Sequence, residues 1–166
     1  MGYDPTGYRL TTKDGMVYEY DQNFGLQRVS DLNGNALAFT RDGINHTSAG
    51  STSVDQQITF VRDAQGRINQ IIDPNGNALR YAYDAKGDLR SFSDQVSNLT
   101  QYAYSAARAH YLTNIIDPLG HNALNLEYDA AGRLVTVRDG NGNPVSQDFN
   151  PDTKLGTFTD ANGNVT

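Results

Sequence analysis

Residues 128–143 have the sequence YDAAGRLVTVRDGNGN, which contains one four-residue pattern twice. The pattern is Asp-x-x-Gly, and it opens at Asp129 and again at Asp139. An Asp side chain at the first position of a turn accepts a backbone N–H bond, and a Gly three residues later adopts positive φ without steric cost. Together they predict a type I turn that ends in a G1 bulge, a common hairpin connection. The stretch therefore predicts two turns with one strand between them.

The same pattern occurs nine times in the chain and uses nine of the 16 glycines. A longer period of 21 residues separates Asp21, Asp42, Asp63 and Asp84, so the repeating unit is two strands and two turns. One class of copies places Arg after the Gly, as at Gly66, whereas another class places Asn there. The residues that we predict to form structural turns are Asp4, Gly7, Asp31, Gly34, Asp63, Gly66, Asp73, Gly76, Asp84, Gly87, Asp117, Gly120, Asp129, Gly132, Asp139, Gly142, Asp160 and Gly163.

The composition also favours strands and turns. There are 17 Asp but only two Glu, together with 16 Gly and ten Tyr. Asp is favoured in turns and Glu in helices. We therefore predict an all-β fold in which tandem antiparallel β-hairpin repeats of about 21 residues form a long curved or spiralling sheet. Residues 1–166 form a single array without a linker, long enough for a sizeable core, and we expect the array to be a fragment of a much longer chain.

Side chains alternate along several of the strands between turns. Leu79, Tyr81 and Tyr83, for example, share one face of an extended strand. In the strand after an Arg-type turn the apolar residues are three apart, as at Ile68 and Ile71. This odd spacing places them on opposite faces of a regular strand, or on one face if a bulge lies between them. The sequence leaves both arrangements open.

Two stretches depart from the repeat. Residues 43–59 are polar and lack the pattern, but the 21-residue step survives across them, so we expect a hairpin with a degenerate turn near residues 48–52. Residues 105–110 insert extra chain between two repeats and could form a single helical turn. They are too short to stand as a helix alone.

Composition and spacing argue against several classes of function. The chain has no Cys and a net charge of −6, and its basic residues are scattered, so we expect no thiolate zinc site, no disulfide and no nucleic-acid partner. No apolar run approaches the roughly 18–20 residues that a membrane helix needs, so we expect no membrane insertion. The three histidines, His46, His110 and His121, lack ligand spacing. We therefore expect no metal and no cofactor.

Each candidate for chemistry also has a structural explanation. The many Asp residues could supply a hydrolytic carboxylate pair, but each lies where a turn needs it. Asp-x-Asn-Gly-Asn, as at Asp139, is similar to part of a calcium loop but lacks the terminal Glu. We therefore predict no catalytic residue and no enzyme activity. The tyrosine columns could pack within the sheet or stack on sugar rings. The candidate glycan-stacking residues are Tyr81, Tyr83, Tyr102, Tyr104 and Tyr128.

Tyr-Asp-x-x-Gly-Arg-Leu, followed about ten residues later by Asp-x-x-Gly-Asn, resembles the YD repeat of rearrangement-hotspot (Rhs) proteins. The resemblance covers nearly the whole chain, and its Tyr-Asp pairs are Tyr3-Asp4, Tyr20-Asp21, Tyr83-Asp84 and Tyr128-Asp129. This family includes bacterial polymorphic toxins, insecticidal toxin complexes, cell-wall-associated proteins and teneurins. The resemblance implies a strip of hairpins that spirals into a hollow shell, which encloses a toxic domain or serves as a large extracellular body.

One family feature is missing from the sequence. Family toxins carry paired Asp-Pro motifs that perform self-cleavage, whereas Asp117-Pro118 lies in phase with the repeat and no second copy follows at short range. We therefore expect a structural segment of a large secreted or surface protein, bacterial in origin, that forms shell wall around a toxin or effector domain or displays it. Its partners would be the rest of the parent chain and the effector, and its sheet edges offer a route to self-association. The alternative is an adhesion module that binds carbohydrate or a cell surface through its aromatic columns.

Overall fold

The computed structural model describes residues 5–150, 155–159 and 163–165, and within them it contains fifteen strands and no helix. The strands of the N-terminal half are β1 (Gly7–Thr11), β2 (Val17–Asp21), β3 (Gly25–Ser30), β4 (Ala36–Thr40), β5 (Gly43–Thr47), β6 (Gln56–Arg62) and β7 (Ile68–Ile72). Those that follow are β8 (Ala78–Tyr83), β9 (Leu89–Ser93), β10 (Leu99–Tyr104), β11 (Leu112–Ile116), β12 (Asn122–Tyr128), β13 (Leu134–Asp139), β14 (Pro144–Asn150) and β15 (Leu155–Thr159).

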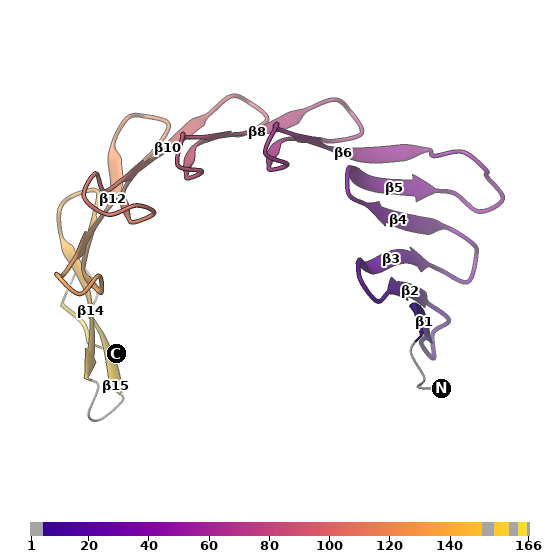
Figure 1. The fold of residues 1–166 in the computed structure, drawn as a ribbon, viewed down its shortest axis with the longest axis horizontal. Helices are drawn as coiled ribbons and strands as arrows, with labels where there is room; N and C mark the ends of the chain where they lie inside the picture. Colours follow the sequence, from indigo (N-terminus) through magenta and orange to yellow (C-terminus); the bar gives the residue numbers. More distant parts are fainter. Residues whose placement is uncertain (1–4, 151–154, 160–162, 166) are drawn as a thin grey trace. The chain divides into compact units, whose positions relative to one another are not determined.

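The chain divides into two compact units, Met1–Leu79 and Arg80–Thr166. In each unit the order of the strands in the sheet is their order in the sequence, and the paired neighbours are antiparallel (Figure 1). Each unit is therefore a meander of hairpins, with a turn after every strand. This confirms the prediction of an all-β fold made of tandem antiparallel hairpins.

Bulges explain the odd spacing of apolar residues in the strands that follow Arg-type turns. Between β6 and β7, Val61 pairs with Gln70 but Arg62 pairs with Ile68, so Asn69 is an extra residue. The same shift occurs between β2 and β3, β8 and β9, β10 and β11, and β12 and β13. Each bulge returns two apolar residues that are three apart to one face of the sheet. Of the two arrangements that the sequence left open, the structure has the bulge.

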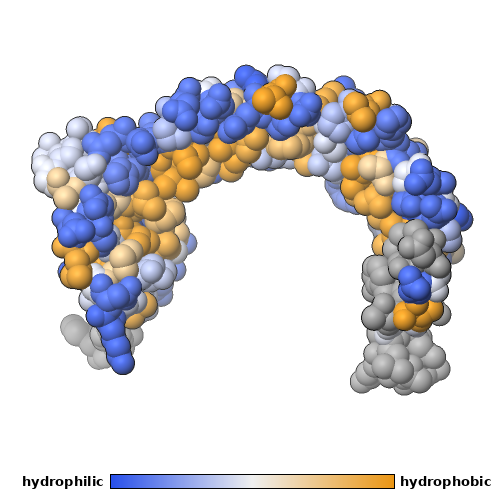
Figure 2. All heavy atoms as spheres, turned by 180° about the vertical axis from the view of Figure 1, so that it is seen from behind, coloured by the Kyte–Doolittle hydropathy of each residue, from blue (hydrophilic) through white to orange (hydrophobic). Residues whose placement is uncertain are grey.

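The sheet of the first unit has an apolar face and a polar face. Direct cross-strand partners share a face, and Leu10, Tyr18, Val29, Leu37 and His46 are successive partners from β1 to β5. Figure 2 shows apolar residues gathered along the strands of this unit, with hydrophilic residues at its margin. On the other face the successive partners are polar or small, and they are Arg9, Glu19, Arg28, Ala38, Asn45 and Gln57.

The second unit repeats this arrangement. Tyr81 is the partner of Phe92, and their rings lie 5.3 Å apart between centroids. Tyr102, Ile115 and Leu124 form a ladder across β10, β11 and β12. The opposite face carries Asn114 with its partners Ala103 on β10 and Asn125 on β12. Both units are thus amphipathic sheets whose apolar residues lie on one side.

Neither apolar face is closed into a core. Ala36 and Ala78 are the apolar side chains that are buried in the described part of the chain, and none of the large side chains there is fully buried. The length of the chain is compatible with a sizeable core, but that expectation is wrong for these units. The reason is that every hairpin pairs with its sequence neighbour in a single layer, so no second layer covers the apolar side chains.

The two departures from the repeat are both loops. In residues 48–55 the N–H of Ser51 donates to the carbonyl of Ser48 (3.0 Å) and Gly50 has φ +75°, which is the degenerate turn that the sequence predicts. Residues 105–110 contain bends and a turn rather than a helical turn. Residues 105–111, which join β10 to β11, are called the strap below.

Candidate functional site

The turn carboxylates are fully engaged by their own turns. Oδ1 of Asp73 accepts the N–H of Asn75 (2.9 Å) and of Asn77 (2.8 Å), and Oδ2 accepts the side-chain amide of Asn77 (2.8 Å). Gly76 has φ +86°, and its N–H donates to the Asp73 carbonyl at 3.0 Å. This is a type I turn closed by a left-handed residue. Both oxygens of the Asp73 carboxylate thus accept hydrogen bonds from within the turn.

Turns of the two classes lie on opposite ends of the strands. Because each strand reverses direction, alternate turns share an end. Turns 31–35 and 73–77 in the first unit, and 94–98 and 139–143 in the second, end in Asn and form what we call the Asn edge. Turns 63–67 in the first unit and 129–133 in the second end in Arg and form the Arg edge. On this edge Nε of Arg67 donates to Oδ2 of Asp63 at 2.7 Å. In each unit the two chemical series in the sequence therefore lie at opposite ends of the strands.

These bonds favour the ionised form of the turn carboxylates. The Asn77 side chain, aided by backbone N–H groups and opposed by partial burial, holds the pKa of Asp73 below its usual value. At Asp129 the backbone N–H and then the side chain of Arg133 lower the pKa in the same way. The pKa values of Asp31, Asp63, Asp84, Asp94, Asp117 and Asp139 are lowered as well. The charges are thus part of the turns rather than poised for proton transfer.

Most of the sequence-predicted turn residues can be placed in the structure. Gly34, Gly66, Gly76, Gly87, Gly120, Gly132, Gly142 and Gly163 all have positive φ. Gly7 begins β1, and Asp4 and Asp160 lie outside the described residues. Ser97 was not among the predicted turn residues, although residues 94–98 form a degraded copy of the pattern, and it occupies the Gly position of that turn with φ +70°.

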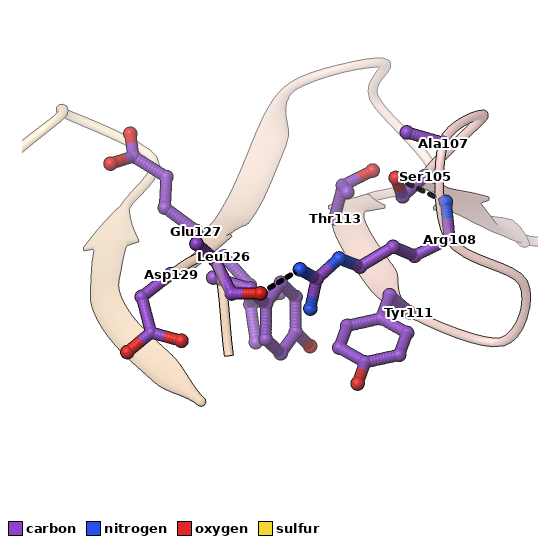
Figure 3. Close-up of a pocket in the computed structure, with 10 residues that line it drawn as sticks. Ser105, Ala107, Arg108, Tyr111, Thr113, Leu126, Glu127 and Asp129 are labelled. Carbon is purple, nitrogen blue, oxygen red and sulfur yellow. Dashed lines mark hydrogen bonds between the residues drawn. The ribbon is translucent and has the colours of Figure 1, made fainter. Parts of the chain in front are cut away.

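The strap links two turns of the Arg edge in the second unit. The guanidinium of Arg108 donates to the carbonyl oxygen of Ala130 in the following turn and lies 5.6 Å from the centre of the Tyr111 ring (Figure 3). In the other direction, Nδ1 of His110 donates to Oδ1 of Asp88 in the preceding turn, at 2.6 Å. The strap thus joins the turns on both sides of it.

A pocket of about 450 Å³ lies beside the strap. Tyr111 and Tyr128 meet edge-to-face in it, with centroids 4.8 Å apart, and Tyr128 donates to the carbonyl of Leu112 at 2.9 Å. The acidic groups of its wall are paired, since Asp129 lies 2.7 Å from Arg133 and Glu127 lies 3.7 Å from Arg138. The pocket has the size of a ligand site. Its charged side chains, however, already have partners, because Asp129 and Glu127 pair with arginines outside the lining and Arg108 donates to the Ala130 carbonyl.

The five candidate glycan-stacking tyrosines share one face of the second unit. The pairing of Tyr81 with Phe92, of Phe92 with Thr100, and of Tyr102 with Ile115 places β8, β10 and β12 tyrosines on that face. All five are half-buried. Tyr104 also donates to the Leu89 carbonyl at 3.0 Å, and its pKa is raised by burial and then by Asp88 and Asp84.

Two further observations concern metal and membrane. Among the described residues there is no group of three or more His, Cys, Asp or Glu side chains that could hold a metal ion. No helix long and apolar enough to cross a membrane occurs in the part of the chain that the structure describes. The histidines instead pair with single carboxylates, as His121 does with Asp117 at 3.3 Å.

Comparison with known families agrees with the hairpin architecture. The family described as "Teneurin YD-shell" matches residues 2–144. The chain belongs to this family. Among solved structures, a chain of "Crystal Structure of TcdB2-TccC3-TEV" matches with a TM-score of 0.32 and 16% sequence identity. The match covers 80% of this chain and 10% of that one. No curated protein matches.

Membership in the YD-shell family makes this chain a segment of a structural shell, and it confirms the resemblance to the YD repeat. The strap contacts, by contrast, were missed by sequence analysis. The available signal was Asp88, which stands where the other turns of this class place Arg, followed by extra residues at 105–110.

Proposed function

We propose that the chain is part of the wall of a YD-type shell in a large secreted or surface protein, and that this shell encloses or displays an effector domain. The observation that carries the proposal is the uncovered apolar face of each sheet. Large uncovered apolar surfaces of soluble proteins mark contacts with a partner. The other face and both edges carry polar groups that suit water.

The rows of apolar cross-strand partners favour an extended contact surface rather than a small binding site. In the first unit apolar partners continue from β1 through β5, and Phe39, Ile44 and Ile58 continue them to β6. A wall of this kind works through shape and solvation, because turn carboxylates such as that of Asp73 accept hydrogen bonds within their own turns. The rest of the parent chain and its effector domain are the partners that we infer.

A matched pair of variants in the parent protein tests the proposal. Ile58 and Gln57 are neighbours on opposite faces of β6. Ile58→Glu places a charge on the apolar face, and Gln57→Glu places it on the polar face. We expect the effector to resist protease in the wild-type parent and in the Gln57→Glu variant, and to become sensitive in the Ile58→Glu variant. Equal resistance in all three, or a parent gene without an effector, would refute enclosure.

The tyrosines of the second unit support a second candidate function, which is glycan binding. Five of them on one face would offer rings to pyranose sugars. Tyr81 already packs on Phe92, and Tyr128 on Tyr111, which favours packing over stacking. Saturable binding of an oligosaccharide by the purified chain, lost in Tyr102→Ala, would replace the shell proposal with this one.

A further inference from the structure

The turn at residues 84–88 differs chemically from the other turns of the Arg edge. Arg67 and Arg133 each donate to Oδ2 of the Asp that opens their turn. The equivalent residue here is Asp88, and an ionised carboxylate can only accept hydrogen bonds. The turn therefore places a second carboxylate beside Asp84, and the usual donor is missing.

Asp88 is also the most buried charged side chain in the described part of the chain, with 8% of it exposed. Its Oδ1 accepts from His110, but its Oδ2 is buried without a hydrogen-bond partner. A buried carboxylate costs several kcal/mol unless it is paired and hydrogen-bonded. Asp88 is thus an incompletely compensated carboxylate, and among the described residues its side chain pairs with His110.

His110 is held at Asp88 at a conformational cost. It has φ +69°, which a non-Gly residue seldom adopts. It belongs to the strap, which the regular repeat lacks, and its side chain is 65% exposed. The imidazole can therefore exchange protons with solvent while the carboxylate that it binds cannot reach water.

Titratable and charged groups of both signs lie near the pair. Asp84 and Lys86 lie on the same turn, Tyr104 and Tyr102 on β10, and Arg108 on the strap itself. Burial, and then Asp88 and Asp84, raise the pKa of Tyr104 on the neighbouring strand. Arg108 is directed away from the pair, toward Ala130.

We propose that His110 and Asp88 form a pH-sensitive latch that fastens the strap to the preceding turn more tightly in mildly acidic than in alkaline solution. Histidine is the side chain that ordinarily changes charge between about pH 5 and 8. When His110 is protonated, its bond to Asp88 becomes an ion pair with a charge-assisted hydrogen bond, which is about twice as strong as a neutral one. When it is neutral, Asp88 remains as an uncompensated buried charge. The proposal stands independently of what the shell contains.

Hydrogen exchange measured by mass spectrometry on the full chain tests the latch. The exchange rates of residues 105–111 are expressed as protection factors, which correct for the intrinsic pH dependence of amide exchange. Since the gain of one charge-assisted bond is of order 1 kcal/mol, we expect protection about three- to ten-fold higher at about pH 5.5 than at about pH 8. The His110→Asn variant keeps a neutral donor and tolerates positive φ. In this variant the protection factors at the two pH values should be equal.

Two further variants make the result specific. Asp88→Asn removes the charge and should also abolish the pH dependence, even if it alters the stability of the turn. His121→Asn removes the exposed pair with Asp117 and should leave the strap unchanged. Equal protection of the wild-type strap at both pH values would overturn the proposal. So would a pH dependence that persists in His110→Asn.

Discussion

Gly132 and Gly120 provide a matched test of the contact between the strap and the next turn. Both lie in Asp-x-x-Gly turns of the second unit and have nearly the same φ, +84° and +83°. A Cβ at Gly120 would meet nothing within 4 Å. A Cβ at Gly132 would collide with the hydroxyl of Tyr111 and would lie 2.7 Å from Nη1 of Arg108. The substitution of each by Ala therefore separates backbone strain from steric conflict.

The expected costs follow from these contacts. Left-handed φ costs a residue with a Cβ about 1–2 kcal/mol, so Gly120→Ala should destabilise by about 1 kcal/mol. Gly132→Ala carries the same strain. It also displaces Arg108 from the Ala130 carbonyl and from the Tyr111 ring, contacts worth about 1 and about 0.5–1 kcal/mol at an exposed site. We expect a total of about 2–3 kcal/mol.

Equilibrium urea unfolding followed by circular dichroism measures the difference. For a slope of about 2 kcal/mol per molar urea, the midpoint should fall by about 0.5 M in Gly120→Ala and by about 1–1.5 M in Gly132→Ala. Tyr111→Phe removes the colliding hydroxyl, so Gly132→Ala should cost less in that background. Equal midpoints for the two Gly variants would refute the inference that the strap is seated on this turn.

Three other predictions concern the turns. Ser97→Gly should stabilise the chain by about 0.5–1 kcal/mol, because it relieves a Ser at φ +70°, whereas Ser91→Gly in β9 should destabilise it; a lower urea midpoint for Ser97→Gly would contradict this. The turn carboxylates have folded pKa values below their unfolded values near 3.9, so their contribution is complete above about pH 4 and is lost as the pH falls through the folded values. Acid titration of the circular dichroism signal should show this loss, and Asp73→Asn should reduce it. A chelator should leave the melting temperature unchanged, since the calcium-like Asp139 segment forms an ordinary turn; a lower melting temperature would reveal a metal that the turn chemistry does not require.

The sequence predicted the turns because their information is local. Asp73 and Asn77 are four residues apart, and the bonds between them need no other part of the chain. The bulges were not decided by sequence, because Asn69 is an extra residue only with respect to β6, its partner strand. Two apolar residues that lie three positions apart fit either arrangement until the pairing register of the two strands is known. The pairing of the strands therefore decides whether a bulge is present, which the spacing of apolar residues alone does not.

The links between turns were also beyond the sequence. Arg62 donates to the carbonyl of Arg41 at 2.7 Å, and these residues lie 21 apart, which is one period of the repeat. The period predicts that the two turns are neighbours on one edge, but it does not predict which side chain crosses between them. At Asp88 a departure from the repeat marks the place, although its partner His110 is 22 residues away in an irregular loop.

The absence of an enclosed core changes where stability comes from in such a sheet. Buried apolar area is small in the described residues, so each hairpin depends more on its own turn and on its two neighbouring strands than a hairpin in a sandwich does. A weak turn should then open locally rather than unfold the whole array. The strap is itself one of the two breaks in the repeat, and it carries two side-chain links to the turns beside it, from His110 and from Arg108. A break in the turn pattern would lower the local stability of the edge at that position. The two links from the strap offset this loss by connecting it to the neighbouring turns.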